Sequence, residues 1–240
     1  MDIHKDFEVP SGRFFTPEDL ELMTGLERIG FIKWREEPFT LKSGILSHVY
    51  VFGRNDLTEN PTVLLRIGSR IMKQLRYFDY HGKREGYDNS NFCLIGIPTA
   101  GTALAIAGSL ADVNGGYAKS RVMREKKKTY GAHNTWVEGK PDHTRHQYVL
   151  VDNVATDGKS KEEAADKLRE DGYEVSQVDC LILVDRQQGA IENLKKIGFR
   201  RIHVVYNLLD IAAAFHHIGF WPEDAVRRVE REIRAHQIPA

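Results

Sequence analysis

Short apolar runs alternate along most of the chain with segments whose apolar positions recur at helical spacing. The runs that predict β-strands are 92–97, 118–123, 148–151, 175–184 and 202–205. The segments that predict helices are 61–77, 102–111, 159–170, 190–196, 208–215 and 222–234. Because strands that alternate with helices favour a parallel sheet covered by helices, the pattern predicts an α/β fold. Ligands of such sheets bind at the carboxyl ends of the strands.

The first 60 residues follow a different pattern from the rest of the chain. The stretch from Thr16 to Asp19 combines a capping residue, a proline and two acids, so a helix is expected from there to about Gly30. Short strands are predicted at 31–34, 39–41 and 47–52, and the polar stretch 79–91 is predicted as a loop. We expect one domain with an N-terminal hood (1–60) over the carboxyl edge of the sheet, an α/β core (61–210) and C-terminal helices (211–240).

The composition argues against several classes of function. The 240 residues carry 34 basic and 34 acidic side chains, so no excess of positive charge indicates nucleic acid. Cys93 and Cys180 lie inside apolar runs and are expected to be buried thiols, not a disulfide or a metal site. No apolar stretch approaches the roughly 20 residues of a membrane span, and the first residues lack a secretory pattern. We therefore expect a cytoplasmic protein without nucleic-acid or membrane partners.

The most informative motif is a predicted strand, loop and helix at 148–170. The apolar run is followed by Asp152, and a loop with Thr156, Gly158 and Ser160 leads into the helix. The first backbone amides of a helix lack partners within it, and the helix dipole is positive at that end, so this geometry favours an anion. The hydroxyls add donors, Gly158 allows a close approach, and the carboxylate of Asp152 can accept from sugar hydroxyls. The motif predicts a sugar-phosphate site.

Two charged segments need their own interpretation. The polar segment 124–145 is about 20 residues long, which is unusual for a connection inside a compact domain unless it is functional or disordered. It begins with Arg124, Lys126, Lys127 and Lys128, which fit either a solvated face or a loop that closes over a polyphosphate. The predicted C-terminal helix at 222–234 alternates basic and acidic residues and is expected to present a solvated face.

Four segments, in order along the chain, resemble the orotate phosphoribosyltransferases, which are type I phosphoribosyltransferases. Residues 39–44 (FTLKSG) resemble a motif near the family's N-terminus, and residues 96–101 (GIPTAG) resemble its pyrophosphate loop. The basic segment 124–131 has the spacing of the family's flexible catalytic loop. The diphosphate-sugar motif at 152–160 and the string VDRQQGA at 184–190, which is similar to the family's VDRQEGA signature, complete the match.

The resemblance implies an activity, a cofactor and an assembly. The reaction would transfer a phosphoribosyl group from 5-phosphoribosyl 1-pyrophosphate to orotate, giving orotidine 5'-monophosphate and pyrophosphate in pyrimidine biosynthesis. Positive charge would grow on the ribose and negative charge on the leaving pyrophosphate, so catalysis would depend on donors placed at those charges. Mg²⁺ is the implied cofactor, bound mainly through the substrate and not by protein side chains. A homodimer is implied because the family's catalytic loop reaches the neighbouring subunit's site.

The same resemblance implies roles for individual residues. Lys128, Arg124 and Asp152 would be catalytic, with the two cations neutralising pyrophosphate and the carboxylate meeting a ribose hydroxyl. Arg186 would pair with the carboxylate of orotate through its planar fork. The other implied substrate-binding residues are Lys42 on the orotate or pyrophosphate side, Lys126 and Lys127 in the basic loop, Asn153, and the 5'-phosphate loop of Thr156, Asp157, Gly158, Lys159 and Ser160.

The chain departs from the family pattern at the reacting centre. Asn153 stands where the family usually has a second acid, and Thr129 stands where an acid often follows the catalytic lysine. Ala100 lies near the place of a lysine in many pyrophosphate loops, and the aromatic pair near the base is only partly kept, as Tyr50 and Phe52. These departures leave two alternatives open: a phosphoribosyltransferase for another base, and a non-catalytic regulator that binds the activated ribose.

Overall fold

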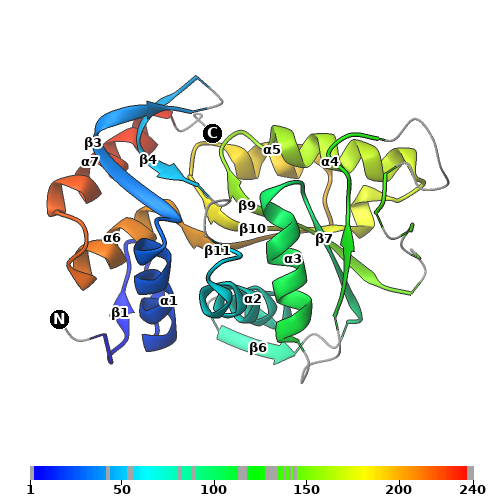
Figure 1. Cartoon of the computed structure of the whole chain (residues 1–240), viewed down its shortest axis with the longest axis horizontal. Helices are drawn as coiled ribbons and strands as arrows, with labels where there is room; N and C mark the ends of the chain where they lie inside the picture. The colour runs from blue at the N-terminus through cyan, green and yellow to red at the C-terminus, as the bar shows by residue number, and fades with distance from the viewer. Residues whose placement is uncertain are drawn as a thin grey trace.

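A five-stranded parallel sheet organises the chain (Figure 1). The computed structural model describes residues 3–41, 44–52, 57–80, 83–87, 90–112, 118–127, 135–137, 139–140, 142 and 145–236, with only the backbone of 77–80 and 83–87. The strands are β7 (Phe92–Gly96), β8 (Lys119–Val122), β9 (Gln147–Ala155), β10 (Asp179–Asp185) and β11 (Arg201–Asn207), in the order β11-β10-β9-β7-β8. Every neighbouring pair is parallel, so the predicted α/β fold is confirmed.

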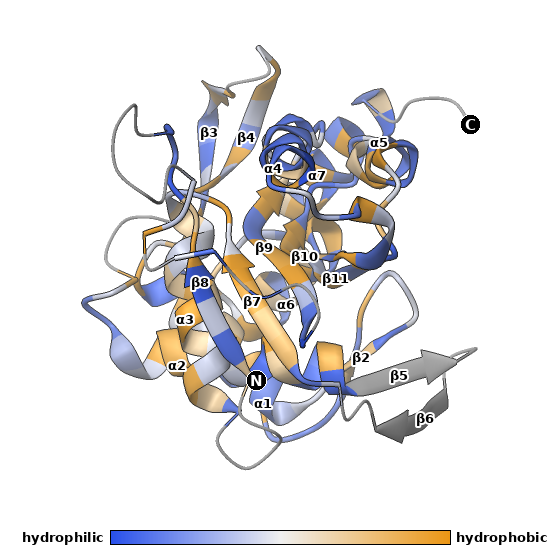
Figure 2. Ribbon diagram, turned by 90° about the vertical axis from the view of Figure 1, so that its right-hand side faces the viewer, coloured by the Kyte–Doolittle hydropathy of each residue, from blue (hydrophilic) through white to orange (hydrophobic). Residues whose placement is uncertain are grey.

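Helices cover both faces of this sheet. They are α1 (Pro17–Arg28), α2 (Pro61–Arg76), α3 (Ala100–Ala111), α4 (Lys159–Glu170), α5 (Ala190–Ile197), α6 (Leu208–Ile218) and α7 (Glu223–His236). Val149 and Val151 of β9 join the core shared with α1, α2, α3 and α6, whereas Leu150 joins the core shared with α4 and α5. This alternation follows from the two-residue period of a strand. Figure 2 shows β7, β9 and β10 as mainly hydrophobic and the edge strand β8 as hydrophilic.

The N-terminal hood is built from a capped helix and a hairpin. Thr16 and Asp19 form a capping box at the start of α1, as their spacing predicts. β3 (Ile32–Thr40) and β4 (Leu46–Val51) pair antiparallel, and they lie beside α7 in Figure 1. The hairpin reaches the carboxyl end of β10, because Arg186 donates to the carbonyl of Val49 at 3.0 Å. The hood therefore contacts the sheet edge at which ligands of this fold class bind.

Four parts of the sequence prediction differ from the structure. The stretch 79–91, predicted as a loop, contains most of the hairpin β5 (Tyr77–Tyr80) and β6 (Lys83–Tyr87), and β1 (Phe7–Glu8) pairs with β2 (Phe14–Phe15) outside the predicted strands. The run 175–184 begins with the 3-10 helix η1 (Val175–Gln177), so the strand begins only at Asp179. β9 continues past residue 151 to Ala155 because its pairing with β10 continues. Backbone ladders do not require apolar side chains, so polarity alone placed these boundaries wrongly.

Candidate functional site

The phosphate motif lies at the carboxyl end of β9, where the chain turns into α4. Gly158 is the N-cap residue, and its φ of +89° is a conformation that favours glycine. Glycine has no side chain to cap the helix, and Asp157 Oδ1 accepts from the amide of Lys159 at 3.1 Å. Thr156 and Ser160 are half-buried, whereas Asp157 and Lys159 are exposed. The structure brings these five residues together at the positive end of a helix, which is the geometry of an anion site.

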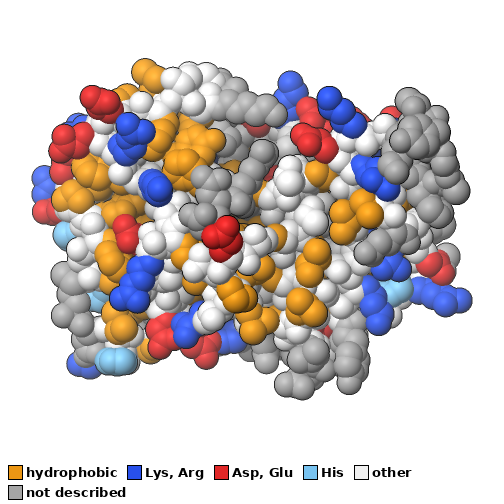
Figure 3. All heavy atoms as spheres, viewed as in Figure 1, with side chains coloured by type: hydrophobic (Ala, Val, Ile, Leu, Met, Phe, Trp, Pro, Cys, Tyr) orange, Lys and Arg blue, Asp and Glu red, His pale blue; other side chains and the backbone are white. Residues whose placement is uncertain are grey.

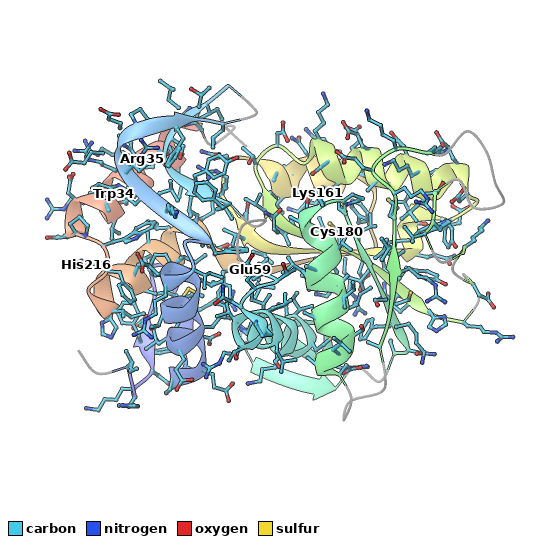
Figure 4. The ribbon with its side chains drawn as sticks, viewed as in Figure 1. Trp34, Arg35, Glu59, Lys161, Cys180 and His216 are labelled. Atoms are coloured by element: carbon cyan, nitrogen blue, oxygen red, sulfur yellow. The ribbon has the colours of Figure 1, made fainter. Side chains whose placement is uncertain are left out.

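The carboxylate of Asp152 already has a charged partner in this chain. Lys161 Nζ lies 2.7 Å from Asp152 Oδ2, and both side chains are buried (3% and 9% exposed). Ser160 Oγ donates to the same oxygen at 3.2 Å, and the ammonium of Lys161 also bonds the carbonyl of Val154. Figure 4 shows Lys161 between α4 and the strands of the sheet. A ribose hydroxyl would therefore meet a neutralised carboxylate beside the uncharged Asn153.

The predicted pyrophosphate loop packs directly against this strand end. The amide of Ile97 donates to the carbonyl of Val151 at 2.9 Å, and the peptide bond between Pro98 and Thr99 is cis. A Cβ atom built on Gly101 would lie 2.1 Å from the oxygen of Val151, so only glycine fits at position 101, in the first turn of α3. The two loops, 96–101 and 156–160, are thus held on neighbouring strands at one edge of the sheet.

Two described cations of the basic segment, Arg124 and Lys127, bond groups outside the phosphate site. The amide of Arg124 donates to the carbonyl of Thr135 at 2.7 Å, and its guanidinium donates to the carbonyl of Trp136 at 3.2 Å. Lys127 pairs with Glu170, the last residue of α4, and Lys126 is exposed. Because α4 has 12 residues, Lys127 lies roughly 17 Å along the helix from the phosphate loop.

Arg186 is buried at the carboxyl end of β10 (2% exposed). Its amide donates to the carbonyl of Ala155 at 3.1 Å, which ties it to the residue before the phosphate loop. Nη2 lies 2.9 Å from Oε1 of Glu232, in α7, and 2.6 Å from Ser47 Oγ. Burial lowers the pKa of Arg186, although the neighbouring Glu232 opposes that shift. The guanidinium predicted to hold a substrate carboxylate already pairs, through Nη2, with a carboxylate of its own chain.

The residue after Arg186 has an unusual backbone. Gln187 has a φ of +60°, which non-glycine residues seldom adopt, and its amide donates to Asp185 Oδ1 at 3.0 Å. Burial raises the pKa of the Asp185 carboxyl, while the bond from Gln187 partly offsets that shift. Such conformations cluster at ligand sites, where the surrounding structure supports their strain.

Lys161 and Glu232 lie beside the predicted site residues and carry charge, but no sequence motif identifies them as part of the site. A signal for Lys161 exists in the sequence, because residues 161, 164, 165 and 168 have the spacing of one helix face and are all buried in α4. Glu232 also lies at helical spacing from the buried Ala225 and Val229, but it stands in a run of alternating charges, and that charge pattern predicts a solvated face. The expectation that α7 presents a solvated face is correct for pairs such as Glu230 with Arg234 and wrong for Glu232, which is 8% exposed.

The hood contributes an aromatic cluster. Tyr50 and Phe52 of β4 and its end have ring centroids 4.5 Å apart, and Phe39 lies 5.3 Å from Tyr50. Arg35 lies over the Phe39 ring at 4.8 Å, and Lys33 lies over the Phe52 ring at 5.1 Å. The partly kept aromatic pair is thus assembled.

Some predicted residues lie outside the part of the chain that the structure describes. They are Lys42, Lys128 and Thr129. None of the described helices combines the length and apolar character that a bilayer crossing requires. Figure 3 shows charged side chains of both signs interspersed with apolar ones over the face in view, in keeping with the balanced composition.

Comparisons with known proteins extend this description. No family model matches the chain. Orotate phosphoribosyltransferase from Pyrococcus horikoshii is 34% identical over 181 residues, 75% of this chain and 86% of that protein. The protein of the same name from Methanocaldococcus jannaschii is 31% identical over 185 residues, 77% of this chain and 92% of that protein. Uridine 5'-monophosphate synthase from Bos taurus is 27% identical over 215 residues, and the chain spans only 40% of its length.

Solved structures show the same fold at lower identity. UMP synthase from Leishmania donovani matches with a TM-score of 0.69 and 23% identity, over 90% of this chain and 42% of that chain. Orotate phosphoribosyltransferase from Mycobacterium tuberculosis, in complex with 5-phospho-alpha-D-ribosyl 1-diphosphate, matches with a TM-score of 0.51 and 19% identity, over 82% of this chain and 93% of that chain. With archaeal relatives above 30% identity over most of both chains, this chain belongs to the orotate phosphoribosyltransferase family.

Proposed function

We propose that this chain transfers the phosphoribosyl group of 5-phosphoribosyl 1-pyrophosphate to orotate. The bond between the anomeric carbon and the pyrophosphate oxygen breaks, its electron pair leaves with pyrophosphate, and a ring nitrogen of orotate bonds the carbon and loses its proton. The observation that carries the proposal is the anion site at 156–160, held beside the buried guanidinium of Arg186. The family membership and the activated ribose bound in the Mycobacterium tuberculosis neighbour support it.

Mg²⁺ belongs to this proposal as an ion that arrives with the substrate. Among the described residues, no group of three or more His, Cys, Asp or Glu side chains is placed to hold a metal. The exposed carboxylate of Asp157 and the phosphate oxygens of the substrate are the hard oxygen ligands that Mg²⁺ prefers. The hard oxygen donors present therefore fit an ion held mainly through the substrate. The bound ion would offset the charge of the leaving pyrophosphate.

The test follows the ultraviolet absorbance of orotate with Mg²⁺ and the activated ribose present. Orotate should be consumed by the wild-type protein and by Lys119→Ala, a variant of an exposed lysine on the edge strand. Turnover should collapse in Lys128→Ala, since that ammonium is expected to meet the developing charge on pyrophosphate. Absence of nucleotide formation in the wild-type protein would contradict the proposal.

A regulator that binds the activated ribose without turnover is the second candidate. Its support comes from the residues expected to contact the ribose. The charge of Asp152 is compensated by Lys161, and the neighbouring Asn153 carries no charge. Calorimetry separates the two candidates, because the regulator should bind the activated ribose and leave orotate unchanged. Binding accompanied by turnover would eliminate it.

The assembly and location are further parts of the proposal. We infer a homodimer in which the basic loop serves the partner's site. A mixture of the inactive variants Lys128→Ala and Asp152→Ala should then regain activity, because a mixed dimer contains one intact site. A cytoplasmic location is supported by Cys93 and Cys180, both buried and free.

A further inference from the structure

Four groups surround the carboxylate of Glu232 and complete its hydrogen bonding. Oε1 accepts from Arg186 Nη2 at 2.9 Å and from Gln188 Nε2 at 3.2 Å. Oε2 lies 2.9 Å from Ser47 Oγ and accepts from the amide of His48 at 3.2 Å. Each oxygen thus has two partners, and one of the four partners, on Oε1, is a guanidinium. Ser47, His48, Arg186 and Gln188 together form what we call the carboxylate seat.

The carboxylate seat is assembled from parts of the chain that already line the site. Ser47 and His48 belong to β4 of the hood, while Arg186 and Gln188 follow β10, next to the phosphate loop. Gln187, between the last two, has the positive φ of +60°. Arg186 is further fixed by its bonds to the carbonyl of Val49 at 3.0 Å and to Gln188 Oε1 at 3.2 Å. The donors are therefore held in place by residues other than Glu232.

Glu232, which occupies the carboxylate seat, comes from a different part of the chain, helix α7. The other acids of this helix form pairs one turn apart on its surface, as Glu223 does with Arg227 and Asp224 with Arg228. Glu232 instead points inward and is the acid of α7 that reaches the strand ends. Because donors arranged for a carboxylate do not distinguish its source, a carboxylated ligand and Glu232 would compete for the same groups.

We propose that Glu232 occupies the place of the substrate's carboxylate, so that a carboxylated base binds only when Glu232 leaves the seat. This inference rests on the proposed function, since it takes the base to be orotate. The internal carboxylate competes at the effective concentration of a group on the same chain, which is on the order of millimolar or higher. Glu232 thereby sets the affinity for orotate and leaves the affinity for a base without a carboxylate almost unchanged.

The test compares orotate with uracil, the same ring without the carboxylate, in Glu232→Gln and in the control Glu230→Gln. Glu230 pairs with Arg234 on the outer face of α7, so its variant matches the charge change outside the seat. In Glu232→Gln the KM for orotate should fall about tenfold or more, because a neutral amide competes less well for the guanidinium. The KM of Glu232→Gln for uracil should stay near that of the wild-type protein. Both KM values of Glu230→Gln, for orotate and for uracil, should also stay near those of the wild-type protein. An unchanged or raised KM for orotate, or an equal effect on uracil, overturns the inference.

Binding measured by calorimetry distinguishes failure of this inference from failure of the proposed function. If no variant turns over orotate but Glu232→Gln binds it at least about tenfold more tightly, the inference holds and the proposed function fails. If orotate is turned over and its affinity is the same in both proteins, the inference alone fails. Binding to neither protein overturns the inference.

A measurement on the wild-type protein covers the case in which Glu232→Gln does not fold. An open seat built for a carboxylate would reject uracil by about 10⁴-fold. A seat filled by Glu232 should prefer orotate over uracil by no more than about tenfold, because the carboxylate of orotate gains only what Glu232 loses. A wild-type preference near the larger value overturns the inference.

Discussion

The two strand ends of the site each hold a buried charge, and each charge is matched in a different way. At the end of β9, Asp152 is matched by Lys161 from the helix that directly follows. At the end of β10, Arg186 is matched by Glu232, 46 residues away in α7. Breaking either pair would leave an uncompensated buried charge. The pair of Asp152 with Lys161 lies within one strand–loop–helix unit, whereas the pair of Arg186 with Glu232 depends on how α7 packs against the strand ends. The pair of Arg186 with Glu232 is therefore the one that a ligand can replace.

The largest expected effect comes from breaking the local pair. Lys161→Ala leaves the carboxylate of Asp152 buried without its ammonium partner, so the free energy of unfolding should fall by about 3–5 kcal/mol. Urea denaturation at pH 7 measures this. The control is Lys195→Ala, whose pair with Glu192 is exposed and should matter by less than about 1 kcal/mol. A loss in Lys161→Ala as small as in the control would show that Asp152 does not depend on this ammonium.

A second carboxylate beside Asp152, at the end of β9, tests whether the missing charge limits the rate. Asn153→Asp places a second carboxylate where positive charge would grow on the ribose, so kcat should rise by one to two decades, equivalent to about 1.5–3 kcal/mol. Steady-state kinetics with orotate measures this. Asn91→Asp, on an exposed residue beside the start of β7, serves as the control. No gain in rate, with binding of the activated ribose retained, would favour the regulator.

A buried carboxylate away from the site tests whether pairing of this kind is general. Asp19 is bonded by Arg70 at 2.9 Å and by Tyr206 at 2.6 Å. Burial alone would raise the pKa of Asp19, but Arg70 and Tyr206 outweigh it and hold the pKa below its usual 3.8. Asp19→Asn should therefore lower the free energy of unfolding by about 1.5–2 kcal/mol at pH 7.

The sign of the pH dependence follows from that lowered pKa. A carboxyl with a lowered pKa stabilises the folded state above the usual value, and this contribution is lost as the pH falls through the folded-state pKa. The difference between wild-type protein and Asp19→Asn should be constant from about pH 5 to 8 and shrink below about pH 4. Urea denaturation across this range measures it, with Glu21→Gln, which removes an exposed pair with Arg66, as the control. A difference that grows in acid would contradict the assignment.

The smallest effect is expected at the ion pair of Lys127 with Glu170, which ties the basic segment to the end of α4. Glu170→Gln releases Lys127 from a pair whose side chains are 41% and 57% exposed, so the free energy of unfolding should change by less than about 1 kcal/mol. If the released loop closes over the substrate, the KM for the activated ribose should fall by at most about fivefold. The control is Glu192→Gln, which frees Lys195 on α5. A larger loss of stability would show that the pair of Lys127 with Glu170 stabilises the fold.

Much of the fold and part of the site can be predicted from the sequence. The core strands, the helices between them and the phosphate loop are local patterns, because the period of the apolar residues and the glycine at the helix start fix them within one segment. Lys161 belongs to this class, since it lies on the buried face of α4 at helical spacing. The hairpin of β5 and β6 does not, because its second strand is polar and glycine-containing, and backbone pairing leaves no apolar period there.

By itself, the sequence determined the parallel sheet and the family and predicted the anion site at 156–160, because each depends on short motifs whose residues are close together along the chain. Only the tertiary structure decided that Arg186 is occupied, because its partner Glu232 is separated from it by 46 residues and stands among alternating charges that predict a solvated face. The choice of one acid of α7 over its neighbours depends on how that helix packs against β4 and the end of β10. Contacts of this kind depend on long-range packing, which the period of a single helix does not encode.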